Sequence, residues 1–276
     1  MSQRREVEAR LSLFNDLSGI LGAMRSFALA ELRRVNKREA AQQQVVLSLS
    51  AALDDLAGEL SLPEAEYGML DGRTGNDIWL LFGSVRGFCG SFNEDVLRCW
   101  QAQAGDHSPM ILLGERLHPM LEARDNLRCI NGANGGLDAP AAIDRILAAI
   151  AELRDGDSRP FGLWACVRDE QAAQAVKLWP LAMPRRMRPG YPPLTNAPIA
   201  EVAGNIAEYY LFHNLLALLL RSIKMENHMR LIQMETALRH LDEGTEEMLR
   251  LRNRLRQEEI VEEIELMAGS RTTSAM

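Results

Sequence analysis

The two ends of this chain carry long apolar stripes without prolines, and these stripes constrain the fold more than any other feature. In the first block no proline occurs before Pro63, and apolar or small residues recur at every seventh position. A sustained seven-residue repeat predicts a helix over 1–60 that packs lengthwise along another helix. The repeat consists of Val7, Phe14, Leu21, Ala28 and Val35, with Leu17, Met24 and Leu32 at intermediate positions.

The last block, 200–270, has the same kind of pattern and contains no proline after Pro198. It holds two seven-spaced series that are offset from each other, as a stutter in a coiled coil would offset them. At ~1.5 Å per residue, 60 helical residues would extend roughly 90 Å, far beyond the helices of an ordinary globular domain. The series are Leu211, Leu218, Met225 and Ile232, then Met234, Leu241, Met248 and Leu255.

Neither helix can bury its apolar stripe alone, so the simplest solution is an antiparallel coiled coil formed by the two ends of the chain. The alternative is a compact all-α bundle, which the length of the last helix disfavours. We expect Leu255, Ile260 and Ile264 to face the partner helix. Gly19 and Gly22 weaken the first helix by up to ~1 kcal/mol each relative to alanine, and they are candidates for a close approach between helices.

The central block, 75–185, has a different rhythm, in which short apolar runs alternate with helical segments. This alternation predicts a small, mostly parallel, Rossmann-like α/β sheet domain inserted between the two terminal helices. A proline-rich stretch at 183–193 separates it from the last helix. The predicted strands are 77–83, 110–117, 127–130, 161–167 and 175–181, and predicted helices include 93–104 and 139–153.

Composition excludes several classes of function. The net charge of -7 argues against a nucleic-acid surface, and the basic run at 32–38 is typical of a solvated helix face. The four cysteines show no close spacing, which favours a reducing, cytoplasmic compartment, and no histidine spacing indicates a metal site. The N-terminal 14 residues are charged and unlike a signal peptide, and the apolar run at 209–220 is too short to span a bilayer.

The glycine-rich stretch at 80–96, "LLFGSVRGFCGSFNEDV", has the shape of a strand, a turn and a helix that often cradles a phosphate. It lacks the lysine of a P-loop and does not fit the dinucleotide-binding pattern. Cys89 has no histidine nearby in sequence that would activate it as a nucleophile. The glycines are therefore interpreted as a tight strand-to-helix turn with Asn93 as the helix N-cap, and no catalytic, cofactor-binding or metal residue is assigned.

Residues 22–34, the glycine-rich stretch at 80–96 and residues 253–269 each carry a recognisable motif, and the three lie far apart in the sequence. Together they resemble the gamma subunit of the F-type ATP synthase, as a diverged branch. The first is "GAMRSFALAELRR" at 22–34, where Arg25 replaces a lysine of the family pattern. The second is the glycine-rich stretch, which departs from the pattern at Val85 and Ser91. The third is 253–269, and Glu226 matches a further short segment. The matching positions are Ala23, Met24, Leu32, Arg33, Arg86, Gly87, Cys89, Gly90, Asn93, Asn253, Arg256, Gln257, Ile260, Glu263, Ile264 and Gly269.

This resemblance implies a non-catalytic rotor shaft without a cofactor. Its implied partners are the alpha and beta subunits as a hexamer, the epsilon subunit and the c-subunit ring, at the cytoplasmic face of the inner membrane. The resemblance places Arg256 and Gln257 at a polar catch with a beta-subunit loop, with Met24 and Arg25 facing them near an acidic loop of beta. It leaves open whether the ring moves protons or sodium ions.

Two other functions stay open at this point. One is a stand-alone nucleotide-binding α/β protein with coiled-coil arms, and the other is a coiled-coil scaffold or secretion adaptor. Binding of a nucleotide by the isolated chain would favour the first, and the proteins that co-purify with it would separate the second from a rotor shaft.

Overall fold

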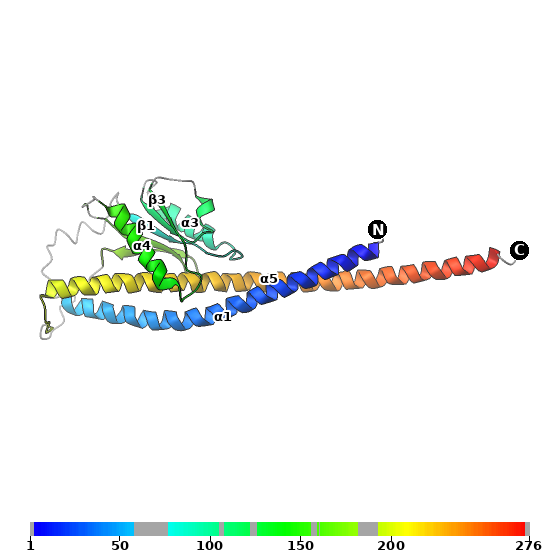
Figure 1. The fold of residues 1–276 in the computed structure, drawn as a ribbon, viewed down its shortest axis with the longest axis horizontal. Helices are drawn as coiled ribbons and strands as arrows, with labels where there is room; N and C mark the ends of the chain where they lie inside the picture. Colours follow the sequence, from blue (N-terminus) through cyan, green and yellow to red (C-terminus); the bar gives the residue numbers. More distant parts are fainter. Residues whose placement is uncertain are drawn as a thin grey trace. The chain divides into compact units, whose positions relative to one another are not determined.

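The computed structural model describes residues 3–57, 77–104, 108–121, 126–155, 159, 161–181 and 193–273, with side chains through 267 (Figure 1). Two long helices lie at the ends of the chain, α1 (Gln3–Ala57) and α5 (Ile199–Thr273). The predicted proline-rich separator falls outside the described residues except for Pro193. The elements between the long helices are β1 (Ile78–Phe82), α3 (Phe92–Gln103), β2 (Met110–Leu113), η1 (His118–Met120), β3 (Leu127–Ile130), α4 (Ala139–Arg154), β4 (Leu163–Arg168) and β5 (Ala173–Trp179).

The central elements form one five-stranded sheet in the order β3-β2-β1-β4-β5. β1 pairs in parallel with both β2 and β4, β2 pairs in parallel with β3, and β5 is antiparallel to β4. The predicted small, mostly parallel sheet is therefore confirmed, and each of the five predicted strands is present. β2 is shorter than predicted because the chain turns at Gly114, whose φ of 106° lies in the left-handed region that favours glycine.

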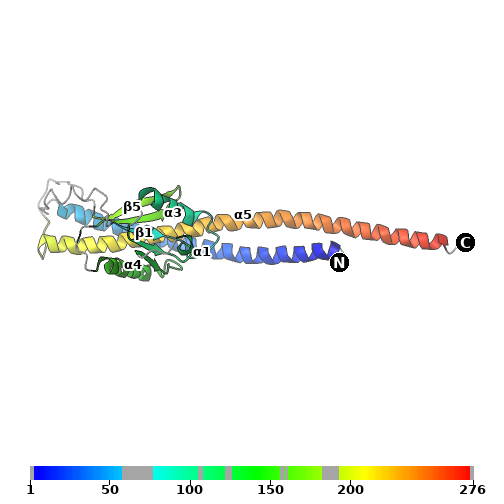
Figure 2. The ribbon, with the colours of Figure 1, turned by 90° about the horizontal axis from the view of Figure 1, so that it is seen from above.

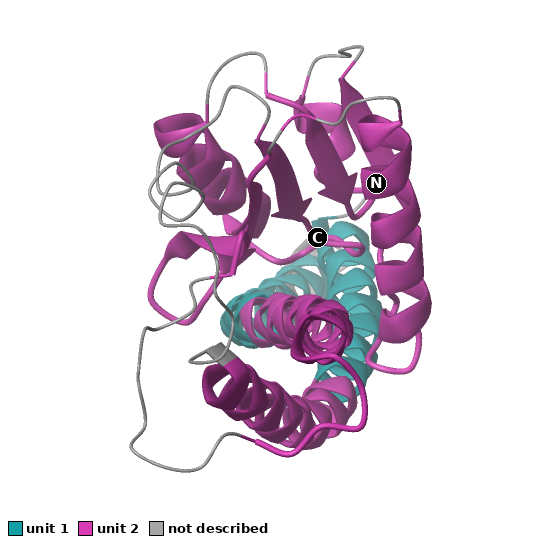
Figure 3. Ribbon diagram, turned by 90° about the vertical axis from the view of Figure 1, so that its left-hand side faces the viewer, with its two compact units in different colours: residues 1–28, 231–276 teal, residues 29–230 magenta. Residues whose placement is uncertain are grey.

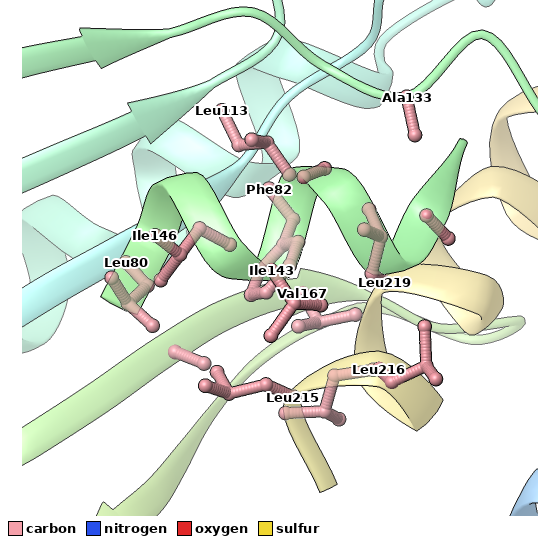
Figure 4. Close-up of a cluster of buried hydrophobic side chains, with 14 of the residues drawn as sticks. Leu80, Phe82, Leu113, Ala133, Ile143, Ile146, Val167, Leu215, Leu216 and Leu219 are labelled. Carbon is pink, nitrogen blue, oxygen red and sulfur yellow. The ribbon is translucent and has the colours of Figure 1, made fainter. Parts of the chain in front are cut away.

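One face of the sheet packs against α4 and α5 (Figure 4). Alternate strand residues such as Leu80 and Phe82 point to this face, since successive side chains of a strand point to opposite sides. α4 contributes Ile143 and Ile146, and α5 contributes the five leucines that lie within 215–220. Val35 of α1 joins the same cluster, so both long helices take part in the core of the α/β region.

The opposite face of the sheet packs against α3. The alternate positions Trp79 and Leu81 point to this side and meet Phe92, Val96 and Trp100 of the helix. Figure 2, seen from above, shows the sheet between α3 and α4. The layers are therefore helix, sheet and helix, as the alternation of strands and helices predicts.

By compactness the chain divides into two units, 29–230 and 1–28 with 231–276 (Figure 3). In the unit 29–230, the Gln42 amide donates to the His213 carbonyl oxygen at 3.0 Å, and Lys224 pairs with Glu39 at 3.1 Å. Residues further along α1 therefore pair with residues earlier in α5. The helices run antiparallel, as predicted.

The other unit, 1–28 with 231–276, consists of the ends of the two long helices and is also antiparallel. Arg4 forms an ion pair with Glu259 at 2.9 Å. A Cβ added at Gly244 would lie 2.9 Å from Cε2 of Phe14, so this glycine marks the close approach of the helices. The expectation of a close approach at Gly19 and Gly22 is wrong, because a Cβ at either position would meet no atom within 4 Å.

The predicted offset between the two apolar series of α5 agrees with burial. In the first series Met225 is buried, whereas Ile232, its last member, is exposed. Burial resumes at Met234, and Leu241, Met248 and Leu255 are half-buried. In the described parts of the chain, no helix is both long and apolar enough to cross a membrane.

Candidate functional site

The loop at 83–93, called the glycine loop below, connects β1 to α3 and is held by Ser84. The Ser84 amide donates to Oδ1 of Asn93 at 2.9 Å, and Nδ2 of Asn93 donates to the Ser84 hydroxyl at 2.9 Å. Asn93 is therefore not the N-cap that the sequence predicts, since α3 begins at Phe92 and its N-cap position is Ser91. Asn93 instead ties the end of the strand to the first turn of the helix.

The glycines of this loop differ in whether, and why, the fold requires glycine at their positions. Gly83 admits close packing, because a Cβ there would lie 2.5 Å from Cβ of Leu117. Gly90 has a φ of 59° and uses the freedom of glycine in the left-handed region, where Phe88 also lies with a φ of 60°. A Cβ at Gly87 would meet no atom within 4 Å, so packing within the chain does not require glycine there.

Glu226 of α5 occupies the amide groups of the glycine loop. The Val85 and Arg86 amides donate to its two carboxylate oxygens at 3.3 and 3.1 Å. Its carboxylate also pairs with Arg230 one turn further along α5, and both residues are buried, at 6% and 3% exposure. Arg230 in turn donates to the Gly87 carbonyl oxygen at 3.1 Å. The loop thus has an anion bound to its amides, and that anion belongs to the protein.

The neighbouring loops close the carboxyl ends of the parallel strands, where open α/β sheets bind ligands. A Cβ at Gly114 would lie 2.5 Å from the Gly83 carbonyl oxygen. A Cβ at Gly132 would lie 2.2 Å from Cγ2 of Val85. With backbones in such close contact, and with the amides of the loop directed at Glu226, the geometry does not provide a phosphate cradle.

Cys89 is buried and does not have the surroundings of a nucleophile. Burial raises the pKa of its thiol above the usual value, and the hydrogen bond to Ser84 at 3.3 Å opposes that shift only in part. The reactive form of cysteine is the thiolate, which a raised pKa disfavours. Within the described parts of the chain, no three His, Cys, Asp or Glu residues gather closely enough to hold a metal ion.

A second loop, 131–136, docks on α1 and accounts for part of the basic run at 32–38. The Gly136 amide donates to Oε1 of Glu31 at 3.0 Å, and its carbonyl oxygen accepts from Arg38 at 2.6 Å. The side chain of Arg86 reaches the same loop and donates to the Asn134 carbonyl oxygen at 3.3 Å. Arg33, Lys37 and Arg38 are all exposed, but the Arg38 guanidinium has a structural role through its hydrogen bond to Gly136.

The residues that the resemblance assigns to partner contact lie in the unit of 1–28 and 231–276, but not opposite one another. Arg4 pairs with Glu259, so the α1 residues opposite Arg256 and Gln257 are those near the start of the helix. Phe14 lies against Gly244, and Met24 is further along α1, which puts it beside residues near 234. At ~1.5 Å per residue, this is roughly 30 Å from Arg256. The expectation that Met24 and Arg25 face Arg256 and Gln257 is wrong.

Met24 belongs instead to a second apolar stripe of α1. The stripe repeats at intervals of four and three residues, which places its members on one face of the helix. Leu17, expected to lie between the helices, is in this exposed set, whereas Met24 is half-buried. The seven-residue repeat places only Leu17 and Met24 between the helices and does not reveal the second stripe, although the spacing of that stripe is readable in the sequence. Its members are Leu13, Leu17, Ile20, Met24 and Phe27.

The C-terminal part of α5 also exposes apolar side chains. Arg256 and Gln257 are exposed, and α5 continues beyond the ion pair of Arg4 with Glu259 (Figure 2). Ile260 and Ile264, expected to face a helix of this chain, are exposed, and only Leu255 of that set is half-buried. The exposed apolar side chains of this segment are Ile260, Val261, Ile264, Leu266 and Met267.

Comparison with known sequences gives consistent matches. Residues 3–272 match the family described as ATP synthase. The ATP synthase gamma chain of Akkermansia muciniphila is 25% identical over 121 residues, which are 44% of this chain and 41% of that protein. Gamma chains of Cereibacter sphaeroides are 28% identical over 106 residues, 38% of this chain and 37% of theirs. The aligned stretches thus span less than half of these relatives.

Comparison with solved structures agrees over a larger part of the chain. The rotor of the Euglena gracilis mitochondrial ATP synthase matches with a TM-score of 0.59 at 14% identity, covering 93% of this chain and 98% of that one. A chain from the central stalk and c-ring of the Tetrahymena thermophila mitochondrial ATP synthase matches with a TM-score of 0.56 at 16% identity, covering 79% and 99%. These likenesses show a shared fold.

Proposed function

Because this chain belongs to the gamma-subunit family of F-type ATP synthases, we propose that it is the central rotor shaft of such an enzyme. In this role it couples rotation of an ion-driven c-subunit ring to the conformational cycle of the catalytic alpha-beta hexamer. The shaft itself is not an enzyme and uses no cofactor. The glycine loop fits this role, because its amides are already engaged by Glu226.

The observation that carries this proposal is the exposed apolar surface of the unit formed by 1–28 and 231–276. In that unit α1 exposes Leu13 and Ile20, and α5 exposes Ile264 and Leu266. Contiguous exposed apolar surface on a protein is typical of an interface. An apolar sleeve formed by a hexamer would cover such side chains with few directional contacts, as a turning shaft requires.

Such a shaft acts through differences in binding free energy. Each face that it presents to a beta subunit favours a different conformation of that subunit, and therefore a different affinity for nucleotide. The surface of this shaft is not chemically uniform. The second stripe of α1 is apolar, whereas Arg254 and Glu258 pair on the surface of α5. Rotation would thus offer unlike surfaces to the three catalytic interfaces in turn.

We further propose the contacts that the family resemblance implies. Arg256 and Gln257 form a polar catch with a beta-subunit loop, for which their exposure leaves them available. Met24 and Arg25 contact the acidic loop of beta at a separate level of the shaft, and Arg25 supplies a charge that complements it. The epsilon subunit and the c-subunit ring are the remaining partners, which would place the chain peripherally at the cytoplasmic face of the inner membrane.

Co-purification is the most informative test. A tagged full chain, expressed with its neighbouring subunits, is expected to bring down alpha, beta and epsilon in one complex. Recovery of the chain alone, or with unrelated proteins, would support a scaffold or adaptor instead. Isothermal titration of the isolated chain with ATP and NADH separates the nucleotide-binding alternative, because a shaft should bind neither.

The proposed catch is tested in the assembled enzyme. Arg256→Ala combined with Gln257→Ala should impair ATP synthesis while leaving the isolated chain folded, because both side chains are exposed. Arg250→Ala is a matched control, since it removes the same charge from the same helix at an exposed position paired with Glu246. Unchanged synthesis and hydrolysis in the double variant would remove the catch from the proposal.

A further inference from the structure

Two of the four cysteines, distant in sequence, meet in the fold. Cys99 lies on α3 and Cys166 on β4, and α3 packs against the face of the sheet to which Cys166 points. The two thiols lie close enough that each acts on the pKa of the other. The other two cysteines are separate from this pair. The Cys89 thiol donates a hydrogen bond to the Ser84 hydroxyl, and Cys129 is exposed on β3.

The thiols are held opposite each other by a second contact between the same two elements. Asp95 of α3 forms an ion pair with Arg168 of β4 at 3.1 Å. From Asp95 to Cys99 is one helical turn, a rise of roughly 6 Å. From Arg168 back to Cys166 is two strand residues, roughly 6.6 Å. Because these two rises nearly match, an ion pair at one end places a thiol opposite a thiol at the other.

A small molecule in solution can reach only one of these two residues. Cys166 is 0% exposed, whereas Cys99 is half-buried and therefore reachable by a small molecule. Burial raises the pKa of both thiols, more strongly for Cys166. The thiolate is the attacking species in thiol–disulfide exchange. Cys99 is more exposed than Cys166 and its pKa is raised less, so the small thiolate fraction of Cys99 is the species that reacts first.

We propose that Cys99 and Cys166 form an intramolecular disulfide when the protein meets a small disulfide such as oxidised glutathione. The Cys99 thiolate attacks one sulfur of glutathione disulfide, which forms a mixed disulfide and releases one glutathione thiolate. The Cys166 sulfur then attacks the Cys99 sulfur while its proton passes to the departing glutathione sulfur, which leaves as the second reduced glutathione. The two protein thiols lose two electrons and two protons, and one glutathione disulfide becomes two reduced glutathione molecules.

The product would cross-link α3 to the central sheet. A disulfide requires an S–S distance of about 2.05 Å, so the two sulfur atoms must approach each other to that distance when the bond forms. α3 follows the glycine loop directly, so the cross-link would fix the helix next to that loop. This inference does not depend on the rotor role.

Peptide mapping of the full chain tests the proposal without any substitution. The folded protein is incubated for hours with glutathione disulfide, remaining thiols are alkylated, and the digest is analysed by mass spectrometry before and after reduction. The expected result is one linked pair of peptides, holding Cys99 and Cys166, that is two hydrogen atoms lighter than the separate peptides. Far-UV circular dichroism before and after oxidation checks that the helices persist.

Two variants sharpen the result. Cys129→Ser removes the exposed thiol and should leave the linked pair at the same yield. Cys99→Ser should leave Cys166 as a free thiol that is alkylated only after denaturation. The proposal is overturned if Cys99 accumulates as a glutathione mixed disulfide while Cys166 stays reduced. It is overturned equally if the unsubstituted chain forms only disulfides through Cys129.

Discussion

Two stretches of the single helix α5 have opposite surroundings. Six consecutive residues, 215–220, are all buried, and at about 100° per residue they cover the whole circumference of the helix. Further along, the apolar residues Ile260, Val261, Ile264 and Leu266 are all exposed. Similar side chains thus serve different ends. In the first stretch they build a core within the chain, and in the second they remain available to something outside it.

The polar contacts of the two units differ in the same way. In the unit 29–230, charged groups are buried and hydrogen-bonded, as Glu226 and Arg230 are with the glycine loop. In the unit 1–28 with 231–276, ion pairs such as that of Arg4 with Glu259 lie at partly exposed positions. Surface ion pairs contribute little stability. The comparison indicates a self-sufficient unit and a unit whose stability should depend on its partners.

The largest expected effect is at Arg230. Arg230→Ala leaves the Glu226 carboxylate buried without its cation, and breaking a buried pair in this way costs about 3–5 kcal/mol. Urea denaturation of the full chain, followed by circular dichroism, measures the loss in the free energy of unfolding. Arg254→Ala is the matched control, because that arginine pairs with Glu258 at the surface and its removal should change little.

A double variant at the same site tests whether the unpaired buried charge causes this loss of stability. Glu226→Gln combined with Arg230→Met removes both charges and should recover part of the loss, because no unpaired charge stays buried. If the double variant is no more stable than Arg230→Ala, the cost lies in lost packing rather than in charge burial.

The next largest change in the free energy of unfolding is expected at one of two leucines of α5. Leu219→Ala removes a fully packed side chain, 3% exposed, and should lower the free energy of unfolding by about 2–5 kcal/mol. Leu266→Ala, at a position 74% exposed, should change it by less than about 0.5 kcal/mol. Equal losses in the isolated chain would contradict the division between a core stretch and a partner-facing stretch. In the assembled complex, Leu266→Ala is expected to have the greater effect on coupling.

The smallest expected effect is the difference in stability gained when each of two helical glycines is replaced by alanine. Gly22→Ala should stabilise the chain by up to about 1 kcal/mol, because alanine favours helix and a Cβ at Gly22 meets open space. Gly244→Ala should gain less, because the new Cβ would lie 2.9 Å from the Phe14 ring, which must then move. Thermal unfolding of the two variants side by side measures the difference, and a larger gain at Gly244 would contradict the close approach.

Local periodicity explains what could be predicted from the sequence. Apolar runs bounded by turns located all five strands, and in β1, β2 and β4 burial on both faces explains the continuous apolar residues. Seven-residue spacing located both long helices and the offset near Met225 and Met234. These features depend on residues close together in the chain, so a single sequence contains them.

Contacts between distant residues explain what was missed. Neither the placement of Met24 away from Arg256 nor the contact of Gly244 with Phe14 follows from spacing, because both depend on the register of two helices. The role of Glu226 at the glycine loop had a readable signal, a glutamate and an arginine four residues apart in an apolar stretch, but its target lies 140 residues away. Asparagine is a residue type that often caps helices, but the side chain of Asn93 is hydrogen-bonded to Ser84 instead.

The burial of α5 over 215–220 restricts one particular freedom of that helix. A helix with one apolar face can slide or roll about its long axis at little cost, because its polar side only exchanges one water contact for another. This stretch has no such side, since any roll would drive leucines out of fitted positions in every direction. It therefore behaves as the fixed root of the helix. If another part of α5 is twisted, residues 215–220 cannot rotate about the helix axis to release the twist. The twist must therefore be held elastically in the backbone hydrogen bonds of the helix.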